Sequence, residues 1–371
     1  MQLYVLKFFC NQESNTLCIA NEGNKADSCF KTKENWFVLS SLVRQKGVVK
    51  TILSSTLFCL NEKGEIILHN SEYIQDFMKK VGFPQEAINC FTAVEKRLDE
   101  EKDFGREMDR LVRSYMYPFA GNIHPRLKKV DALAEKYGVS PYTLDMVFLL
   151  NCTPILKKRY ENKGISEEIF WDTMDDLRCK LLECMKVKEV CGTFVAGWFN
   201  GFFELRRFAL GRFQYEHSRY EDKNPYTLSC GRTVKRGDKT IGFHIPSSGI
   251  SLTGDVRMAS YKKAYEFYKK DFHGKPILFS CGSWLLYPEH KKFLPENSHI
   301  LEFMDDFEIP FSATQEEFHD GWRIFGKYAD LPVNELPRDT ALQRAYADWL
   351  AAGNKSGDGW GMFCFDGEKI L

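Results

Sequence analysis

The sequence predicts an α+β protein, in which a helical N-terminal domain is followed by a mixed β-sheet domain with flanking helices. Three observations favour this class. Apolar residues recur at helical spacing from residue 71 to about residue 191, and near Gly192 the pattern changes to strand-like alternation. A βαβ-like unit follows over residues 240–287. We therefore predict a helical domain over residues 68–197 and a sheet domain over residues 198–371.

Bulk composition places few constraints on partners. The 371 residues include 51 Lys and Arg and 51 Asp and Glu, so the formal net charge is zero and neither nucleic acid nor an anionic membrane is an expected partner. No apolar run approaches the length of a membrane span. The 12 cysteines lack the regular spacing of a disulfide-rich domain, and they form no Cys-x-x-Cys pair. We expect reduced thiols in a cytoplasmic protein that has no structural zinc.

The first 67 residues are poorly patterned and are treated as a leader. Our hypothesis is that they are mistranslated and lie outside the natural protein, or are disordered. The codons for residues 63–65, Lys-Gly-Glu, can spell a ribosome-binding sequence. Leu68, three residues later, can be encoded by the alternative start codon TTG. The alternative is a genuine accessory segment with weak patterning, which shows no sustained helical or strand period apart from residues 38–43 and 51–60.

The pattern predicts a series of amphipathic helices in the first domain. Ser71 caps a first helix, and Pro84 lies in the first turn of a second. Further apolar stripes cover residues 108–115, 127–137, 142–150 and 166–185. These stripes are typical of core-facing helices.

One segment of this domain looks like a DNA-binding helix-turn-helix. It spans residues 133–144, and its second helix would have to place basic and polar side chains in a major groove. The residues after Thr143 are instead Leu-Asp-Met-Val-Phe-Leu-Leu, and no Lys or Arg occurs before Lys157. The sequence therefore predicts a buried αα hairpin.

The second domain opens with strand-like segments. Residues 204–217 alternate as one strand, which places Arg212, Gln214 and Glu216 on one face. That polar face either lines a cleft or is simply solvated. Further elements are predicted as a hairpin over residues 226–245, a short helix over 288–293, a strand over 299–309, a helix over 340–351 and a last strand over 361–365.

The chemistry of the βαβ unit is expected at its first turn. An apolar run over residues 241–245 leads into a glycine-bearing loop, and Thr253 is positioned to cap the helix that follows. Such a loop presents several backbone amides together, which can bind phosphate without a basic side chain. An ordinary tight turn is the alternative, and Asp255 in the first helical turn argues against a phosphate directly on the helix end.

Three segments resemble a bacterial acyltransferase family: residues 207–216, 242–246 and 281–286. Members of that family carry a helical N-terminal domain and a C-terminal domain similar to the GNAT-type N-acyltransferases. The resemblance extends from about residue 73 to the C-terminus. In GNAT-type folds, the strand–loop–helix unit holds the pyrophosphate of acyl-CoA. Here residues 245–254 replace the usual Gln/Arg-x-x-Gly-x-Gly/Ala loop.

The resemblance implies an N-acyltransferase. It would use acetyl-CoA or another acyl-CoA as co-substrate, with no metal, and would acylate a small-molecule or peptide amine. The expected CoA-binding residues lie in the loop and first helical turn: Pro246, Ser247, Ser248, Gly249, Ser251, Thr253 and Gly254.

Other polar residues are candidates for the substrate cleft and for proton transfer. Glu216 or His244 would take the proton of the amine, and a cleft would be lined by Arg212, Gln214, Ser283 and Trp284. Direct transfer from a thioester to an amine needs no covalent intermediate, so Cys281 is not assigned as a nucleophile. The rival function is a non-catalytic ligand-binding or protein-interaction module on the same fold, and a donor other than CoA is a further alternative.

Overall fold

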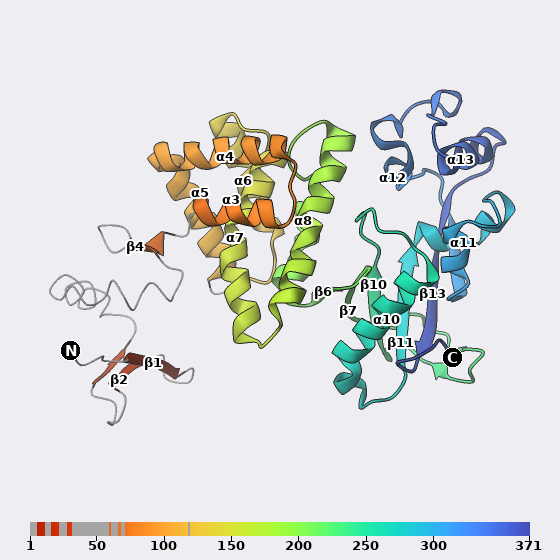
Figure 1. Ribbon diagram of the computed structural model, residues 1–371, viewed down its shortest axis with the longest axis horizontal. Coiled ribbons are helices and arrows are strands. Elements are labelled where there is room, and N and C mark those ends of the chain that lie inside the picture. The colour runs from red at the N-terminus through yellow and green to blue at the C-terminus, as the bar shows by residue number, and fades with distance from the viewer. Residues whose placement is uncertain are drawn as a thin grey trace. The chain divides into compact units, whose positions relative to one another are not determined.

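A computed structural model of the chain describes residues 71–117 and 119–371, together with the backbone of short strands between residues 6 and 67 (Figure 1). The chain separates into two units, Met1–Leu68 and His69–Leu371. In the first unit, β1 (Leu6–Asn11), β2 (Thr16–Asn21) and β3 (Ser28–Lys31) form an antiparallel sheet, and β4 (Cys59–Leu60) pairs with β5 (Ile66–Ile67). The sequence pattern did not predict β1 to β3. The leader hypothesis for residues 1–67 otherwise falls outside the described residues.

The second unit begins with the predicted helices. They are α3 (Ser71–Lys80), α4 (Gln85–Glu100), α5 (Lys102–Met116), α6 (His124–Tyr137), α7 (Pro141–Asn162) and α8 (Glu167–Lys188). The hydroxyl of Ser166 caps α8 by accepting a hydrogen bond from the amide of Ile169 at 3.3 Å. Helix α7 is buried continuously from Thr143 to Leu156. This burial confirms the prediction of a packed αα hairpin, because a DNA-reading helix would expose a polar face.

A six-stranded mixed sheet forms the second part of this unit, as predicted (Figure 1). Its order is β12 (Glu308–Thr314), β13 (Gly357–Phe365), β11 (Ile277–Ser283), β10 (Lys239–His244), β7 (Phe213–Arg219) and β6 (Arg207–Leu210). Strands β10 and β11 are adjacent and parallel, with Ile241 opposite Phe279. Helix α10 (Gly254–Tyr268) connects them, which confirms the predicted βαβ unit.

Aromatic side chains build the core on the α10 face of the sheet. The ring of Tyr261 on α10 lies 5.7 Å from Phe213 and 4.9 Å from Phe363. Ser260, one residue earlier, donates a hydrogen bond to the carbonyl of Leu210 at 2.7 Å and bonds the Tyr215 hydroxyl at 2.9 Å. These contacts dock α10 closely on β7, and they leave the alternate residues of β7 for the opposite face.

The predicted strand over residues 204–217 is wrong in one respect. The segment is a hairpin in which β6 pairs antiparallel with β7, and Gly211 and Arg212 form its turn. Gly211 adopts φ +79°, which favours glycine. A two-residue turn leaves the alternation of apolar and polar residues uninterrupted, so the pattern cannot reveal the reversal. A short helix, α9 (Asn200–Phe203), precedes the hairpin.

The predicted hairpin over residues 226–245 is also wrong. Strand β8 (Tyr226–Thr227) pairs with β9 (Thr233–Val234), whereas β10 pairs with β7. The turn over residues 235–238 does exist, because the amide of Asp238 donates to the carbonyl of Lys235 at 3.0 Å. The six-residue β10 forms a longer ladder with the seven-residue β7 than it could form with a two-residue strand.

The last predicted elements are partly correct. The prediction of one strand over residues 299–309 was wrong, because α11 (His299–Met304) occupies most of that segment before β12 begins. The hydroxyl of Ser298 caps this helix by accepting a hydrogen bond from the amide of Ile300. A 3₁₀ helix over Pro288–Lys292, α13 (Ala341–Ala351) and the final strand β13 confirm the other three predictions. A further short helix is α12 (Gly321–Phe325). Within the described part of the chain, no helix is both long and apolar enough to cross a bilayer.

Asp145 on α7 is predicted to destabilise the fold as the pH rises. Its side chain is buried, and burial together with the charge of Asp131 raises its pKa to about 8. Because this pKa is above the unfolded value, Asp145 does not lower the free energy of unfolding below about pH 4, and it lowers that free energy progressively as the pH rises towards 8. We expect Asp145→Asn to stabilise the protein at pH 8 by about 1–3 kcal/mol, and by less at pH 5.

Thermal midpoints of both proteins at the two pH values measure this difference. Asp330→Asn, at an exposed position, is the control and should shift the midpoint equally little at each pH. A stabilisation by Asp145→Asn that is the same at pH 5 and pH 8 would show that the carboxyl group of Asp145 does not titrate between them.

Candidate active site

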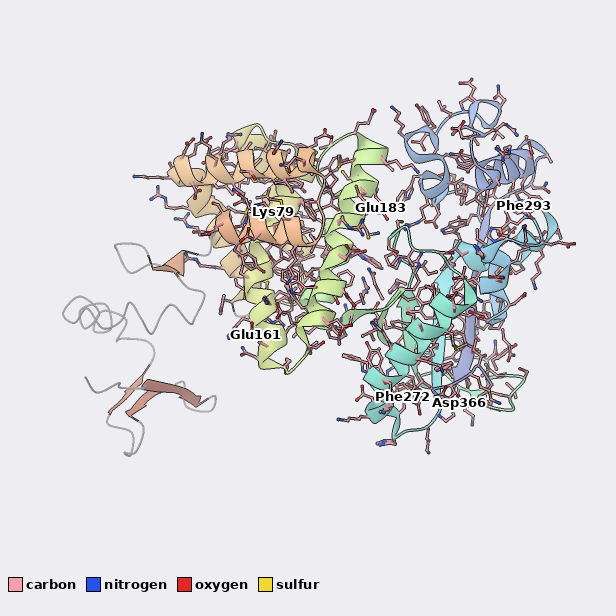
Figure 2. The ribbon with its side chains drawn as sticks, viewed as in Figure 1. Lys79, Glu161, Glu183, Phe272, Phe293 and Asp366 are labelled. Atoms are coloured by element: carbon pink, nitrogen blue, oxygen red, sulfur yellow. The ribbon has the colours of Figure 1, made fainter. Side chains whose placement is uncertain are left out.

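A cavity of about 420 Å³ lies where β10 and β11 end. One wall comes from the helical domain, through Lys180 and Glu183 of α8 and through Trp198; Figure 2 marks Glu183. The opposite wall comes from the ends of the central strands, the loop after β10 and α12. Both domains therefore build this site.

The two central strands part at the cavity. Their parallel pairing ends with Gly242 opposite Ser280, although β10 continues to His244 and β11 continues to Ser283. On its other side, β11 stays paired with β13 as far as Ser283. The ends of β10 and β11 therefore face a gap and not each other. Backbone groups along this gap are available to a ligand that lies between the strands.

His244 and Glu216 form a hydrogen-bonded pair beside the gap. Nε2 of His244 lies 2.8 Å from Oε1 of Glu216, and the imidazole stands edge-on to the ring of Trp198 at 4.8 Å. The side chain of His244 is 35% exposed and lines the cavity. In the neutral tautomer that donates a hydrogen bond from Nε2–H to this carboxylate, the lone pair of the ring lies on Nδ1.

Cations hold Glu216 in its ionised form. The guanidinium groups of Arg207 and Arg206 lie 2.7 Å and 3.1 Å from its two oxygens. Burial alone would raise the pKa of Glu216, but His244 and Arg207 lower it to about 2. A carboxylate with this pKa binds a proton weakly near neutral pH. It is better suited to orienting His244 than to accepting a proton.

A buried polar cluster lies beside this pair. Gln214 is opposite His244 in the pairing of β7 with β10, so the two side chains share a face of the sheet. On α8, Asp176 accepts a hydrogen bond from the indole of Trp198 at 2.9 Å, and Lys180 forms an ion pair with Glu183 at 2.9 Å. Burial raises the pKa of Asp176, and the charge of Lys180 opposes that change.

Arg212 shapes the loop after β10. Its buried guanidinium donates to the carbonyl of Pro246 and to the carbonyl of Ile250, each at 2.9 Å. Gly249 at the tip has φ +79°. Within the part of the chain that the structure describes, the amides of Ser247, Ser248, Gly249 and Ser251 donate no hydrogen bond. Arg212 thus binds the loop carbonyls, whereas these amides remain available.

Thr253 precedes the first residue of α10, as predicted, but its hydroxyl makes no capping hydrogen bond to the helix. The expected side-chain cap was therefore wrong, although the position was right. Asp255 in the first turn has a lowered pKa, owing first to a hydrogen bond from Thr253. The hydroxyl of Thr253 is thus directed to a side chain and not to an amide.

Cys281 lines the cavity as a neutral thiol. It is 3% exposed, and burial raises its pKa to about 12. A thiol attacks as its thiolate, so this residue is poorly suited to carry an acyl group. The eight cysteines among residues 71–371 are all free.

The structure brings part of the expected site together. The cavity wall contains Arg212, Gln214, His244, Pro246, Ser247, Ser283 and Trp284. The remaining candidates do not line it: Glu216, Ser248, Gly249, Ser251, Thr253 and Gly254.

Sequence reasoning missed the contribution of α8. Asp176, Lys180 and Glu183 are buried and recur at helical spacing, which gives α8 a polar stripe beside its apolar one. Charged residues are rarely buried without a partner, so this second stripe was the available signal. Trp198 and Trp322 also line the cavity and lie far apart in the sequence.

Comparison with known proteins assigns the class. Residues 72–205 match the N-acyltransferase N-terminal domain, and residues 207–363 match the GNAT-like C-terminal domain. The chain is therefore an acyltransferase, and it belongs to the family that joins these two domains. This assignment confirms the expected resemblance and argues against a non-catalytic module.

The fold is also similar to solved acyltransferases. One, in complex with decanoyl-CoA and teicoplanin, has a TM-score of 0.62 at 17% identity over 89% of this chain and 99% of that chain. Another, in complex with decanoyl-CoA, has a TM-score of 0.61 at 19% identity over 88% and 98%. A mutant in complex with octanoyl-CoA has a TM-score of 0.61 at 17% identity over 89% and 99%. At these identities the similarity concerns the fold. A search of curated protein sequences found no match to this chain.

Cys230 and Cys281 should differ strongly in reactivity. Cys230 is exposed, whereas Cys281 is buried with a raised pKa. We expect iodoacetamide to modify Cys230 at least about a hundredfold faster than Cys281 in the folded protein, because only the thiolate reacts. Peptide mass spectrometry over a time course measures both rates, and labelling in urea should remove the difference. Equal rates in the folded protein would restore Cys281 as a candidate nucleophile.

Proposed function

We propose that the protein transfers an acyl group from acyl-CoA to an amine, with the thioester in the gap between β10 and β11. The observation that carries this proposal is the parting of the strands beside a histidine whose Nε2 bonds Glu216 and whose Nδ1 has no partner among the described residues. The pantetheine chain of CoA carries amides, which can pair with the backbone of the parted strand ends. In this arrangement the thioester would lie near His244.

The loop after β10 would bind the pyrophosphate. Its amides are available, and Arg212 holds the loop carbonyls on the other side. Ser247, Ser248 and Ser251 add hydroxyl donors. Although the familiar glycine pattern is absent, this arrangement offers the same kind of donor, since backbone amides bind phosphate without regard to the side chains beside them.

His244 would act as the general base. The amine nitrogen forms a bond with the thioester carbonyl carbon, one amine proton passes to Nδ1 of His244, and the carbon–sulfur bond breaks to release CoA as its thiolate. His244 then returns the proton to the thiolate or to solvent. Glu216 keeps Nε2 protonated throughout, because its pKa of about 2 leaves it ionised. Cys281 takes no part in this direct transfer.

The test of this proposal covers several donors and acceptors. Because the similar structures contain octanoyl-CoA and decanoyl-CoA, these donors should be tested beside acetyl-CoA. The acceptor is a small-molecule or peptide amine. Calorimetry with CoA, followed by measurement of CoA thiol release with a panel of amines, tests the proposal. Failure to bind CoA or any of these acyl-CoA donors would overturn it.

Gly249→Val should weaken CoA binding. Gly249 has φ +79°, so a β-branched residue strains the turn and turns its amides away from the pyrophosphate. We expect the dissociation constant of CoA to rise about tenfold or more, while the sheet keeps the domain folded. Calorimetry and the thermal midpoint measure the two effects.

Gly353→Val is a matched control for this substitution. Gly353 has φ +81° and, like Gly249, has open space where a Cβ would lie, but it belongs to the turn after α13. It should lower the thermal midpoint to a similar degree and leave CoA affinity unchanged. Unchanged affinity in Gly249→Val as well would mean that the loop is only a structural turn.

His244→Gln should slow transfer without weakening acyl-CoA binding. Loss of a general base lowers rates by about 10²–10⁴-fold. Thiol release with an amine acceptor and calorimetry with acyl-CoA measure the two quantities. His217→Gln is the control, because His217 lies on the same sheet but is half-exposed and pairs with Asp271 at 3.2 Å. Equal rates for His244→Gln and the wild type would exclude His244 as the base.

A further inference from the structure

The side-chain oxygen of Gln214 is a buried acceptor without a donor. Gln214 is 2% exposed and lines the cavity, and its Oε1 accepts no hydrogen bond from any residue that the structure describes. Buried polar atoms in folded proteins are almost always paired, and leaving one unpaired is unfavourable. An unpaired atom in a cavity wall is therefore expected to meet a donor on a ligand.

Gln214 lies next to the proposed base. It is opposite His244 in the antiparallel pairing of β7 with β10, so the two side chains project from neighbouring positions of the same face. Glu216 occupies Nε2 of His244, which leaves Nδ1 as the acceptor on that ring. Two neighbouring residues of the cavity wall thus each carry a hydrogen-bond acceptor, Nδ1 of His244 and the buried Oε1 of Gln214.

The carboxylate of Asp176 orients the amide of Gln214. Interaction with Gln214 is one of the causes that lower the pKa of Asp176, and the indole of Trp198 donates to the same carboxyl group at 2.9 Å. In its ionised form, which the charge of Lys180 favours, Asp176 attracts the NH₂ group of the amide and repels its oxygen. Asp176 is therefore a positioning residue that leaves the oxygen of Gln214 for the ligand.

We propose that Gln214 accepts the second N–H of the attacking nucleophile, so that the site selects primary amines as acyl acceptors. The inference rests on the proposed acyl transfer. A neutral primary amine has two N–H groups and a lone pair, so it can donate to His244 and to Gln214 while its lone pair attacks the thioester carbonyl. A secondary amine or an alcohol has a single proton to donate. If that proton goes to His244, the oxygen of Gln214 stays unpaired.

The expected discrimination follows from this difference. Sites that hydrogen-bond a substrate group reject analogues that lack it, because a buried partner is left without its bond. Wild-type protein should therefore turn over a primary amine roughly ten- to a hundredfold faster, in kcat/KM, than the matched N-methyl amine or alcohol. Chemical differences between the acceptors also affect these rates, so the decisive quantity is how a substitution at Gln214 changes the ratio.

The test uses Gln214→Met, which keeps the length of the side chain and removes its oxygen. The probes are benzylamine, aminohexane, glycine methyl ester and glucosamine, each beside its N-methyl derivative, and benzyl alcohol; the donors are acetyl-CoA and octanoyl-CoA. Release of CoA thiol gives the rates, and calorimetry gives the donor affinity. We expect Gln214→Met to reduce the primary-to-secondary ratio at least about fivefold, through slower turnover of the primary amine, with unchanged donor affinity.

Gln315→Met is the matched control. The oxygen of Gln315 is also buried without a partner among the described residues, but it does not line the cavity. This variant should keep the wild-type ratio. It separates the effect of removing a buried amide from the effect of removing the contact with the acceptor.

The outcomes separate this inference from the proposed function. An unchanged ratio in Gln214→Met with a normal thermal midpoint would overturn the role of Gln214. Donor binding without turnover of any primary amine in the panel would also overturn the inference, while the donor half of the proposed function would stand. Absence of donor binding by the wild-type protein would overturn both. If Gln214→Met fails to fold, Gln214→Leu and Gln214→Ala replace it, and loss of folding in all three would assign Gln214 a structural role and overturn the inference.

Discussion

The parting of β10 and β11 is the constraint on which the site depends. A parallel pair requires a crossover, and α10 provides it on one face of the sheet. Aromatic packing against Tyr261 and the hydrogen bonds of Ser260 hold that helix against β7. The strands stay paired at Ile241 and Gly242 and separate beyond them. The same packing that stabilises the sheet thus leaves its ends open, at the place where the loop, the histidine and the cavity meet.

Side chains alternate along β7, so one face of the strand carries core residues and the other carries polar residues of the site. Phe213 and Tyr215 face α10 and belong to the core, whereas Gln214 and Glu216 face the helical domain. Charges on that second face are compensated by partners. Arg207 illustrates this: its guanidinium bonds Glu216 and lies 3.8 Å from the centre of the Trp198 ring. Neighbouring strands of the sheet domain therefore compensate the charge of Glu216, and the helical domain contributes Lys180 and Glu183 to the wall of the cavity.

Two candidate residues have roles other than those expected, and in both the reason is that their polar groups are already occupied by neighbours. Arg212 was expected in a substrate cleft, and it lines the cavity, but its donors are taken by the carbonyls of the loop. Glu216 was one of two candidate bases, and its contacts with Arg206, Arg207 and His244 make it a partner of the other. Residue type and strand parity identify which side chains share a face. They do not reveal which of those side chains already have partners.

The sequence by itself determined the helical first domain, the βαβ unit and the polar face of β7, because each depends on periodicity over neighbouring residues. It did not determine the reversal at Gly211 or the pairing of β10 with β7, since a two-residue turn leaves the alternation intact and strand partners are chosen by long-range packing. Nor did it indicate that Lys180 and Glu183 of α8 face His244 across one cavity. Only the tertiary structure decided these points, because they depend on contacts between segments that local patterns cannot connect.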